Sequence, residues 1–137
     1  MTRAKLRTRS NNHLNPNKNV CVLAVAKKLG VENESRYFHW MKDLVRAART
    51  KYTVRSRMSS VKGMSIGKAR AKMAQMALEV DAIGFLVEVS GHALLLDATG
   101  KSWVDTDPRQ RDGRKILKLY VVYAKECKVI WAKGWYS

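Results

Sequence analysis

The stretch FLVEVSGHALLLDATGKSWVD, residues 85–105, decides the fold of this chain. Three short apolar runs are separated here by two groups of turn-forming residues. Runs of this length, rich in branched and aromatic side chains and bounded by glycine, are typical of strands joined by tight turns. Neighbouring strands with such short connections pair antiparallel. The stretch therefore predicts three consecutive antiparallel strands, over 85–89, 92–97 and 102–105.

The sequence before this stretch has the three-to-four spacing of apolar residues that indicates helices. We predict a first helix over 20–29 that stops at Gly30. A second helix begins at a Ser35 cap, and a third begins at a Ser65 cap. Their apolar positions are Tyr37, Phe38, Met41, Leu44, Val45 and Ala48 for the second helix, and Ala69, Met73, Met76, Ala77 and Val80 for the third.

Two further apolar runs follow the central stretch. Residues 116–123 predict a long strand, and residues 129–131 predict a last edge strand. Helices first and a meander of strands afterwards indicate an α+β domain with an antiparallel sheet. We expect one such domain over 19–137, preceded by a basic arm over 1–18.

Length and composition agree with a single globular domain. The chain has 137 residues, of which 46% are hydrophobic and 28% are charged, and this balance excludes a disordered chain. No apolar run approaches the roughly 20 residues that a membrane span needs. Two cysteines are too few for a disulfide framework, and the polar start lacks the apolar core of a signal peptide. We expect a cytoplasmic protein with free thiols and no integral membrane association.

The charge is strongly positive, because 27 Lys and Arg residues face 11 Asp and Glu residues. Basic residues concentrate in 1–18, 42–72 and 109–118, and such an excess favours an anionic partner, whether nucleic acid, an acidic protein surface or a charged membrane face. A solvated basic face is the simpler alternative. The residues expected to bind nucleic acid nonspecifically are Arg46, Arg49, Arg55, Arg57, Lys68, Arg70 and Lys72, with the arm at Arg3–Arg9 adding reach and Tyr37, Trp40 and Tyr52 as stacking or core aromatics.

Cys21 lies in the first turn of the first predicted helix, where the helix dipole and unpaired N–H groups lower a thiol pKa. His92 opens a predicted strand, and the turn at 98–101 brings Asp105 back beside it. Asp107 lies two residues on and is the alternative acid. This order favours a nucleophile, a base and an orienting acid. The simpler alternatives are a small buried cysteine and a histidine hydrogen-bonded at a strand start.

The remaining candidates lack such a setting. Asp97 fits a turn initiator, and His13 and His39 fit surface or packing positions. Cys127 lies between charged residues and is expected to be inert. Because Cys21, His92 and Cys127 do not have the paired spacing of zinc ligands, we expect no metal and no cofactor.

Three motifs, NVCVLA at 19–24, GHALLLD at 91–97 and WVDTDP at 103–108, resemble papain-like cysteine peptidases. The resemblance is to the compact bacterial and phage types that are related to the bacteriocin-processing peptidases. It implies a papain-like fold and an oxyanion-hole amide upstream of the cysteine. Asn15 stands six residues before Cys21, where that family usually has glutamine.

The motifs and the residue order together predict a thiol hydrolase with a Cys21–His92–Asp105 triad and Asn15 in the oxyanion hole. Small size, a basic arm and the phage-like motif suggest a viral accessory protein that acts on a protein substrate of the host, and we expect such a protein in the host cytoplasm. The alternative is a catalytically inactive binding module on the same fold, which uses its basic surface to hold nucleic acid or an acidic host protein.

Overall fold

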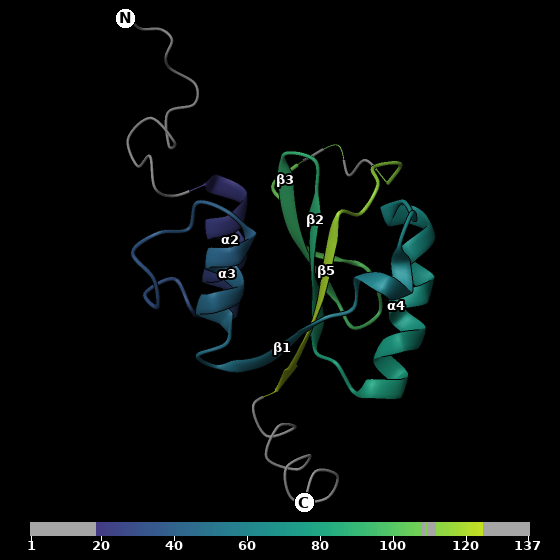
Figure 1. Ribbon diagram of the computed structural model, residues 1–137, viewed down its shortest axis with the longest axis horizontal. Coiled ribbons are helices and arrows are strands. Elements are labelled where there is room, and N and C mark those ends of the chain that lie inside the picture. The colour runs from purple at the N-terminus through teal and green to yellow at the C-terminus, as the bar shows by residue number, and fades with distance from the viewer. Residues whose placement is uncertain (1–18, 108, 110–111, 125–137) are drawn as a thin grey trace, which may run out of the picture.

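A computed structural model of the chain describes residues 19–107, 109 and 112–124 (Figure 1). Helices and strands follow one another in an α+β order, as the sequence predicts. The elements are α2 (Val20–Leu29), α3 (Met41–Ala48), β1 (Tyr52–Ser56), the 3₁₀ helix η1 (Met58–Val61), α4 (Ile66–Val80), β2 (Gly84–Val89), β3 (His92–Asp97), β4 (Ser102–Val104) and β5 (Lys118–Ala124).

The strands form one five-stranded sheet in the order β1-β5-β2-β3-β4, and every neighbouring pair is antiparallel. The antiparallel sheet is confirmed. A simple meander is wrong beyond β4, because β5 returns to the far side of β2 instead of pairing with β4. The segment before β5 explains this return: Ile116 N donates to Met64 O and Leu117 N donates to Glu88 O, which leads the chain across to the other edge of β2.

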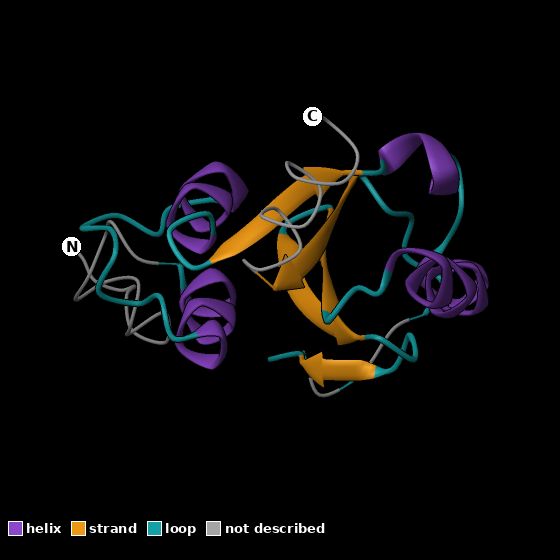
Figure 2. Cartoon of the chain, turned by 90° about the horizontal axis from the view of Figure 1, so that it is seen from below, coloured by secondary structure: helices purple, strands orange, loops and turns teal. Residues whose placement is uncertain are grey.

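Helices cover both faces of the sheet, so the described chain has three layers (Figure 2). One face of β2 contributes Leu86 to a core shared with α2 and α3, while the alternate residues Phe85 and Val87 belong to a second core under α4 and η1. This alternation follows from the two-residue period of a strand. All six residues of β2 are buried, because both of its faces are covered.

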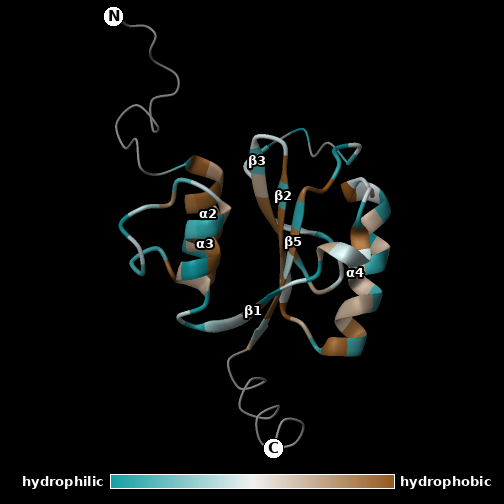
Figure 3. Ribbon diagram, viewed as in Figure 1, coloured by the Kyte–Doolittle hydropathy of each residue, from teal (hydrophilic) through white to brown (hydrophobic). Residues whose placement is uncertain are grey.

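The hydropathy pattern agrees with this layering. In Figure 3, α2 and the central strands carry hydrophobic colour, whereas the edge strand β1 runs from white to teal. No helix in the described part of the chain is long and apolar enough to cross a membrane.

Two of the three predicted helices are confirmed, together with the predicted Gly30 stop and Ser65 cap. Asn19 Oδ1 accepts a hydrogen bond from Cys21 N at the start of α2, and Gly30 ends this helix in the left-handed conformation at φ 73°. At α4, the Ser65 side chain accepts a hydrogen bond from Lys68 N. Such caps satisfy backbone groups that a helix end leaves unpaired.

The predicted start of the second helix is wrong. The α-helix begins at Met41, not after Ser35, because Asp43 Oδ2 accepts hydrogen bonds from the backbone N–H groups of His39 and Trp40 and so caps the helix there. The Ser35 hydroxyl instead closes a local turn with Tyr37. His39 accordingly lies in the turn before the helix and not on it.

Strand β1 is absent from the sequence-based prediction, which treated residues 42–72 as one basic block. Its alternating Tyr52-Thr53-Val54 pattern is typical of a strand, and it pairs with β5 from Tyr52↔Ala124 to Ser56↔Tyr120. The predicted strand over 116–123 begins at Lys118 instead, and the one over 102–105 ends at Val104. The predicted edge strand at 129–131 lies outside the described residues, as do the arm over 1–18 and the end of the domain.

Candidate functional site

The first part of the candidate site is the Cys21 thiol at the N-terminus of α2. Its Sγ donates to Asn19 Oδ1 across 3.2 Å, and the same oxygen accepts from Cys21 N across 3.3 Å. Asn19 is itself held by a 2.7 Å hydrogen bond from its N–H to Phe38 O. The thiol therefore has a defined orientation, and the residue is only 6% exposed.

Burial has the largest effect on the pKa of the Cys21 thiol. It raises the pKa of Cys21 above its ordinary value, and the nearby Asp105 carboxylate raises it further, while hydrogen bonds from the backbone of Ala93 and of the helix start lower it. The expectation that the helix N-terminus lowers this pKa is therefore wrong as a net effect, because desolvation of the thiolate outweighs the helix N–H groups. At neutral pH the resting thiol is protonated.

Ala93 and Asp105 both affect the pKa of Cys21, so the thiol lies near both residues. Ala93 follows His92 at the start of β3 and packs in the same core as Cys21. Two motifs that lie about 70 residues apart in sequence therefore meet where the start of α2 faces the start of β3.

His92 and Asp105 form the second part of the site. The distance from His92 Nε2 to Asp105 Oδ1 is 2.7 Å, and both side chains are largely buried, with exposures of 12% and 9%. The pairing of Leu95 with Val104 between β3 and β4 brings the two residues together. The predicted contact between His92 and Asp105 is confirmed.

This contact settles which ring nitrogen is engaged. An ionised carboxylate only accepts hydrogen bonds, so Asp105 favours the tautomer with its proton on Nε2. Nδ1 is then left as the acceptor nitrogen of the ring. Among the described residues, the hydrogen bond of the Cys21 thiol goes to Asn19 and not to His92.

Asp107 has a different role from Asp105. Its backbone N–H donates to Asp105 Oδ1 across 2.9 Å, so the acid that contacts His92 also receives a hydrogen bond from its own loop. The Asp107 carboxylate accepts from Arg109 Nε at 3.2 Å and lies 3.8 Å from Arg114 Nη1. Geometry therefore favours Asp105 over Asp107 as the partner of His92.

Arg114 connects this acidic loop to the turn that carries His92. Its guanidinium donates to Ser90 O in the turn between β2 and β3 and also pairs with Asp107. The sequence prediction counted Arg114 only as one of many basic residues, and no local pattern marks it. Its role depends on two loops that are distant in sequence.

Glu88 is the other residue that the prediction missed. It is 6% exposed on β2, directly opposite Ala93 in the register with β3. Its Oε2 accepts from Trp40 Nε1 across 3.0 Å, and its Oε1 has no hydrogen-bond partner among the residues that the structure describes. The position of this acid within the apolar run 85–89 indicates a buried carboxylate, and a buried carboxylate requires a hydrogen-bonding partner.

The seven predicted nucleic-acid-binding residues lie on both sides of the sheet. Arg46 lies on α3 and Lys68 and Lys72 lie on α4, and these helices cover opposite faces of the sheet (Figure 1). Arg46 pairs with Asp43 at 3.5 Å, and the Arg49 guanidinium donates to Val54 O at 3.0 Å.

Arg70 has a structural role. Its guanidinium donates to Gly100 O at 2.8 Å, to Ser102 Oγ at 3.1 Å and to Asp112 Oδ1 at 2.9 Å. It therefore links α4 to the turn between β3 and β4 and to the loop before β5.

The three aromatic candidates also differ from one another. The Trp40 indole donates to Glu88 and the Tyr52 hydroxyl donates to Leu29 O, so both are engaged within the fold. Tyr37 is 47% exposed and is the one of the three that can stack on a base without rearrangement.

Several other predictions can be placed. Asp97 is confirmed as a turn residue, because its Oδ1 accepts from the N–H groups of Thr99 and Lys101. Asn15, His13, Cys127 and the basic arm lie outside the described residues. Within the described ranges, no three His, Cys, Asp or Glu side chains gather in a way that could hold a metal ion.

No protein-family model, curated protein or solved structure matches this chain.

Proposed function

We propose that this protein is a thiol hydrolase with a papain-like arrangement, in which Cys21 is the nucleophile, His92 the general base and Asp105 the residue that orients His92. The observation that carries the proposal is the 2.7 Å hydrogen bond between His92 and Asp105, located beside a thiol that opens a helix. Histidine between an acid and a nucleophile is the arrangement that activates weak nucleophiles.

The raised pKa of Cys21 decides how the thiol reacts. Since a stable thiolate is disfavoured at neutral pH, His92 accepts the thiol proton as Sγ bonds to the carbonyl carbon. His92 then gives this proton to the leaving group as the acyl bond breaks. Water attacks the resulting thioester, releases the acid and restores the thiol, with His92 again relaying the proton.

Backbone N–H groups at the start of α2 stabilise the oxyanion that forms in each addition step. Asn15 is the side chain that the resemblance suggests for a second donor. Asn15 stands six residues before Cys21 in the sequence.

The experiment uses p-nitrophenyl acetate as a generic acyl donor. We expect a burst of p-nitrophenolate and an acetyl group on Cys21, located by peptide mass spectrometry. Cys21→Ala and His92→Ala should each abolish the burst, and Cys127→Ala is the matched control that should retain it. A burst that persists in Cys21→Ala, or one that only Cys127→Ala removes, would contradict the proposal.

One observation favours a second candidate, a binding module whose thiol does not turn over. Cys21 is 6% exposed and its pKa is raised by burial, which are the properties of an inert structural cysteine. In this case the excess of basic residues, and not the thiol, provides the function. An absent burst with intact folding would favour this candidate.

A further inference from the structure

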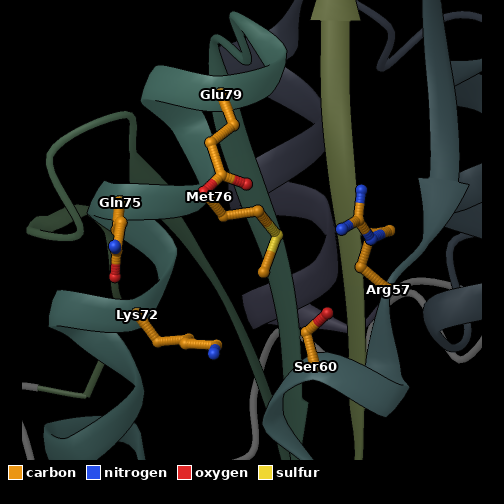
Figure 4. A pocket seen from close by; sticks show the side chains of 6 residues that line it. All are labelled: Arg57, Ser60, Lys72, Gln75, Met76 and Glu79. Carbon is orange, nitrogen blue, oxygen red and sulfur yellow. The ribbon is translucent and has the colours of Figure 1, made fainter.

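A polar cleft lies between η1 and α4, within the layer of the molecule on the opposite side of the sheet from Cys21. Its volume is about 230 Å³, and its walls are Arg57 and Ser60 on one side and Lys72, Gln75, Met76 and Glu79 on the other. Figure 4 shows Lys72 extending from α4 toward Ser60, with Arg57 and Glu79 further along the cleft. None of the residues that line this cleft belongs to the proposed triad.

The cations of the cleft are not neutralised by the fold. Within the described chain, the side chains of Arg57 and Lys72 have no ion pair and no hydrogen bond, in contrast to Arg46, Arg70 and Arg114. Arg57 is nevertheless well positioned, because its backbone N–H donates to Leu119 O and its carbonyl accepts from Ser60 N. The cleft therefore presents two unpaired cations and a hydroxyl on a fixed backbone.

We propose that this cleft binds a phosphate group, held between Lys72, Ser60 and Arg57. A phosphate has several acceptor oxygens pointing in different directions, so it can accept from donors on both walls at once. A carboxylate has two oxygens in one plane and matches donors on one wall better. Arginine binds phosphate with a planar fork and lysine as a point charge.

The basic residues around the cleft favour a phosphate that belongs to the backbone of a nucleic acid. Lys68 is exposed one turn before Lys72 on α4, and Lys62 is exposed at the end of η1, so basic residues continue beyond the cleft along both elements. The formal net charge of +16 favours a polyanion over a single small anion. This site stands whether or not Cys21 is reactive, and it specifies the anionic partner of the second candidate function.

The test is fluorescence anisotropy with a labelled oligothymidylate of about ten nucleotides at ~50 mM salt. The double variant Arg57→Gln with Lys72→Gln should weaken binding about tenfold or more. The matched control, Lys27→Gln with Lys42→Gln, removes the same charge from α2 and α3 and should weaken binding by less than about threefold.

Two further variants test whether binding depends on the cleft itself or only on the net charge of the protein. Ser60→Ala leaves the charge unchanged and should weaken binding a few-fold by removing one donor. Glu79→Gln removes a repulsive carboxylate from the end of the cleft and should strengthen binding about two- to threefold. Circular dichroism checks that each variant folds.

Competition identifies the source of the phosphate. If inorganic phosphate displaces the labelled oligonucleotide and chloride at the same ionic strength does not, the result would support a site that a free phosphate fills. Displacement by unlabelled oligonucleotide alone would support the diester backbone. Equal losses in the two double variants would overturn the proposal, and so would a labelled polyglutamate that binds the wild type as tightly as the oligonucleotide does. The acylation assay on Cys21 is unaffected by either outcome.

Discussion

At the scale of single residues, the two acids after β4 differ in what they contact. Asp105 Oδ1 contacts His92 Nε2 and also accepts from the N–H of Asp107, whereas the Asp107 carboxylate faces Arg109 and Arg114. An acid that is buried against a histidine fixes its tautomer and stabilises its cation. An acid that pairs with arginines stabilises the conformation of its loop, and it affects the orientation of the histidine only through that loop.

Asp105→Asn should therefore lower the rate of acyl transfer from p-nitrophenyl acetate about 100-fold or more. The amide of asparagine can donate to His92 and so stabilise the wrong tautomer. Asp107→Asn should cost about tenfold or less, because the backbone N–H that supports Asp105 remains. The two variants are compared by burst rate at the same pH, and the reverse ranking would assign the orienting role to Asp107.

The buried thiol also has a consequence for stability. Because the pKa of Cys21 is raised in the folded protein, the protonated thiol is favoured by folding. The stability that it contributes is fully present below the pKa of an unfolded cysteine, about 8.5. It is lost as the pH rises through the higher folded value, since the unfolded chain then binds fewer protons.

The difference in unfolding free energy between wild type and Cys21→Ala should therefore shrink from pH 7 to about pH 10. Urea unfolding at several pH values measures it, and the alanine variant carries every other titrating group as an internal control. A difference that stays constant or grows over this range would contradict the raised pKa.

At the scale of elements, α4 is held to the sheet by a contact between a helix and a turn. Gly100 adopts φ 84° in the turn between β3 and β4, and a Cβ there would collide with the backbone oxygen of Arg70. The Arg70 side chain then reaches Gly100 O, Ser102 and Asp112. One residue of α4 thus bonds to two segments that are separate in sequence, the turn that leads into β4 and the loop before β5.

Arg70→Gln should destabilise the protein by about 1–3 kcal/mol, because it leaves partly buried acceptors without a donor. Arg70→Lys should restore only part of the loss, since one ammonium cannot reproduce the fork of the guanidinium. Lys68→Gln, an exposed change on the same helix, is the control and should alter stability by less than about 0.5 kcal/mol. Urea unfolding compares the three, and equal effects of Arg70→Gln and Lys68→Gln would mean that the network contributes nothing.

At the scale of the whole molecule, the sheet separates the candidate thiol site from the proposed phosphate cleft. Cys21 packs in the core under α2 and α3, whereas Met76 of the cleft belongs to the core under α4. Basic residues lie on both sides, so a single nucleic acid strand on the α4 side engages a minority of them. The relevant side chains are Arg57, Lys62, Lys68 and Lys72.

This separation predicts the salt dependence of binding. Four phosphate contacts on a single strand give a slope of about −3 in a plot of log affinity against log salt. Affinity should then fall more than tenfold between ~50 and ~200 mM salt, with slight sequence preference. Anisotropy titrations at four salt concentrations provide the slope. A slope steeper than about −6 would show that basic residues outside the α4 side also bind.

The sequence alone was sufficient for local features whose cause is local. Gly30 ends α2 and Ser65 begins α4, as predicted, because caps act within a few residues. The pairing of β3 with β4, and with it the contact of His92 with Asp105, follows from the short turn between the two strands.

Only the tertiary structure decided features that depend on distant segments. The start of α3 is set by Asp43 competing with Ser35 for the role of cap, and the place of β5 is set by hydrogen bonds to Met64 and Glu88. The balance of forces on Cys21 is of the same kind: a helix start lowers a thiol pKa locally, but burial by the rest of the fold outweighs it. Likewise, the basic residues of 42–72 are continuous in sequence, and the sheet that folds between α3 and α4 divides them between opposite faces.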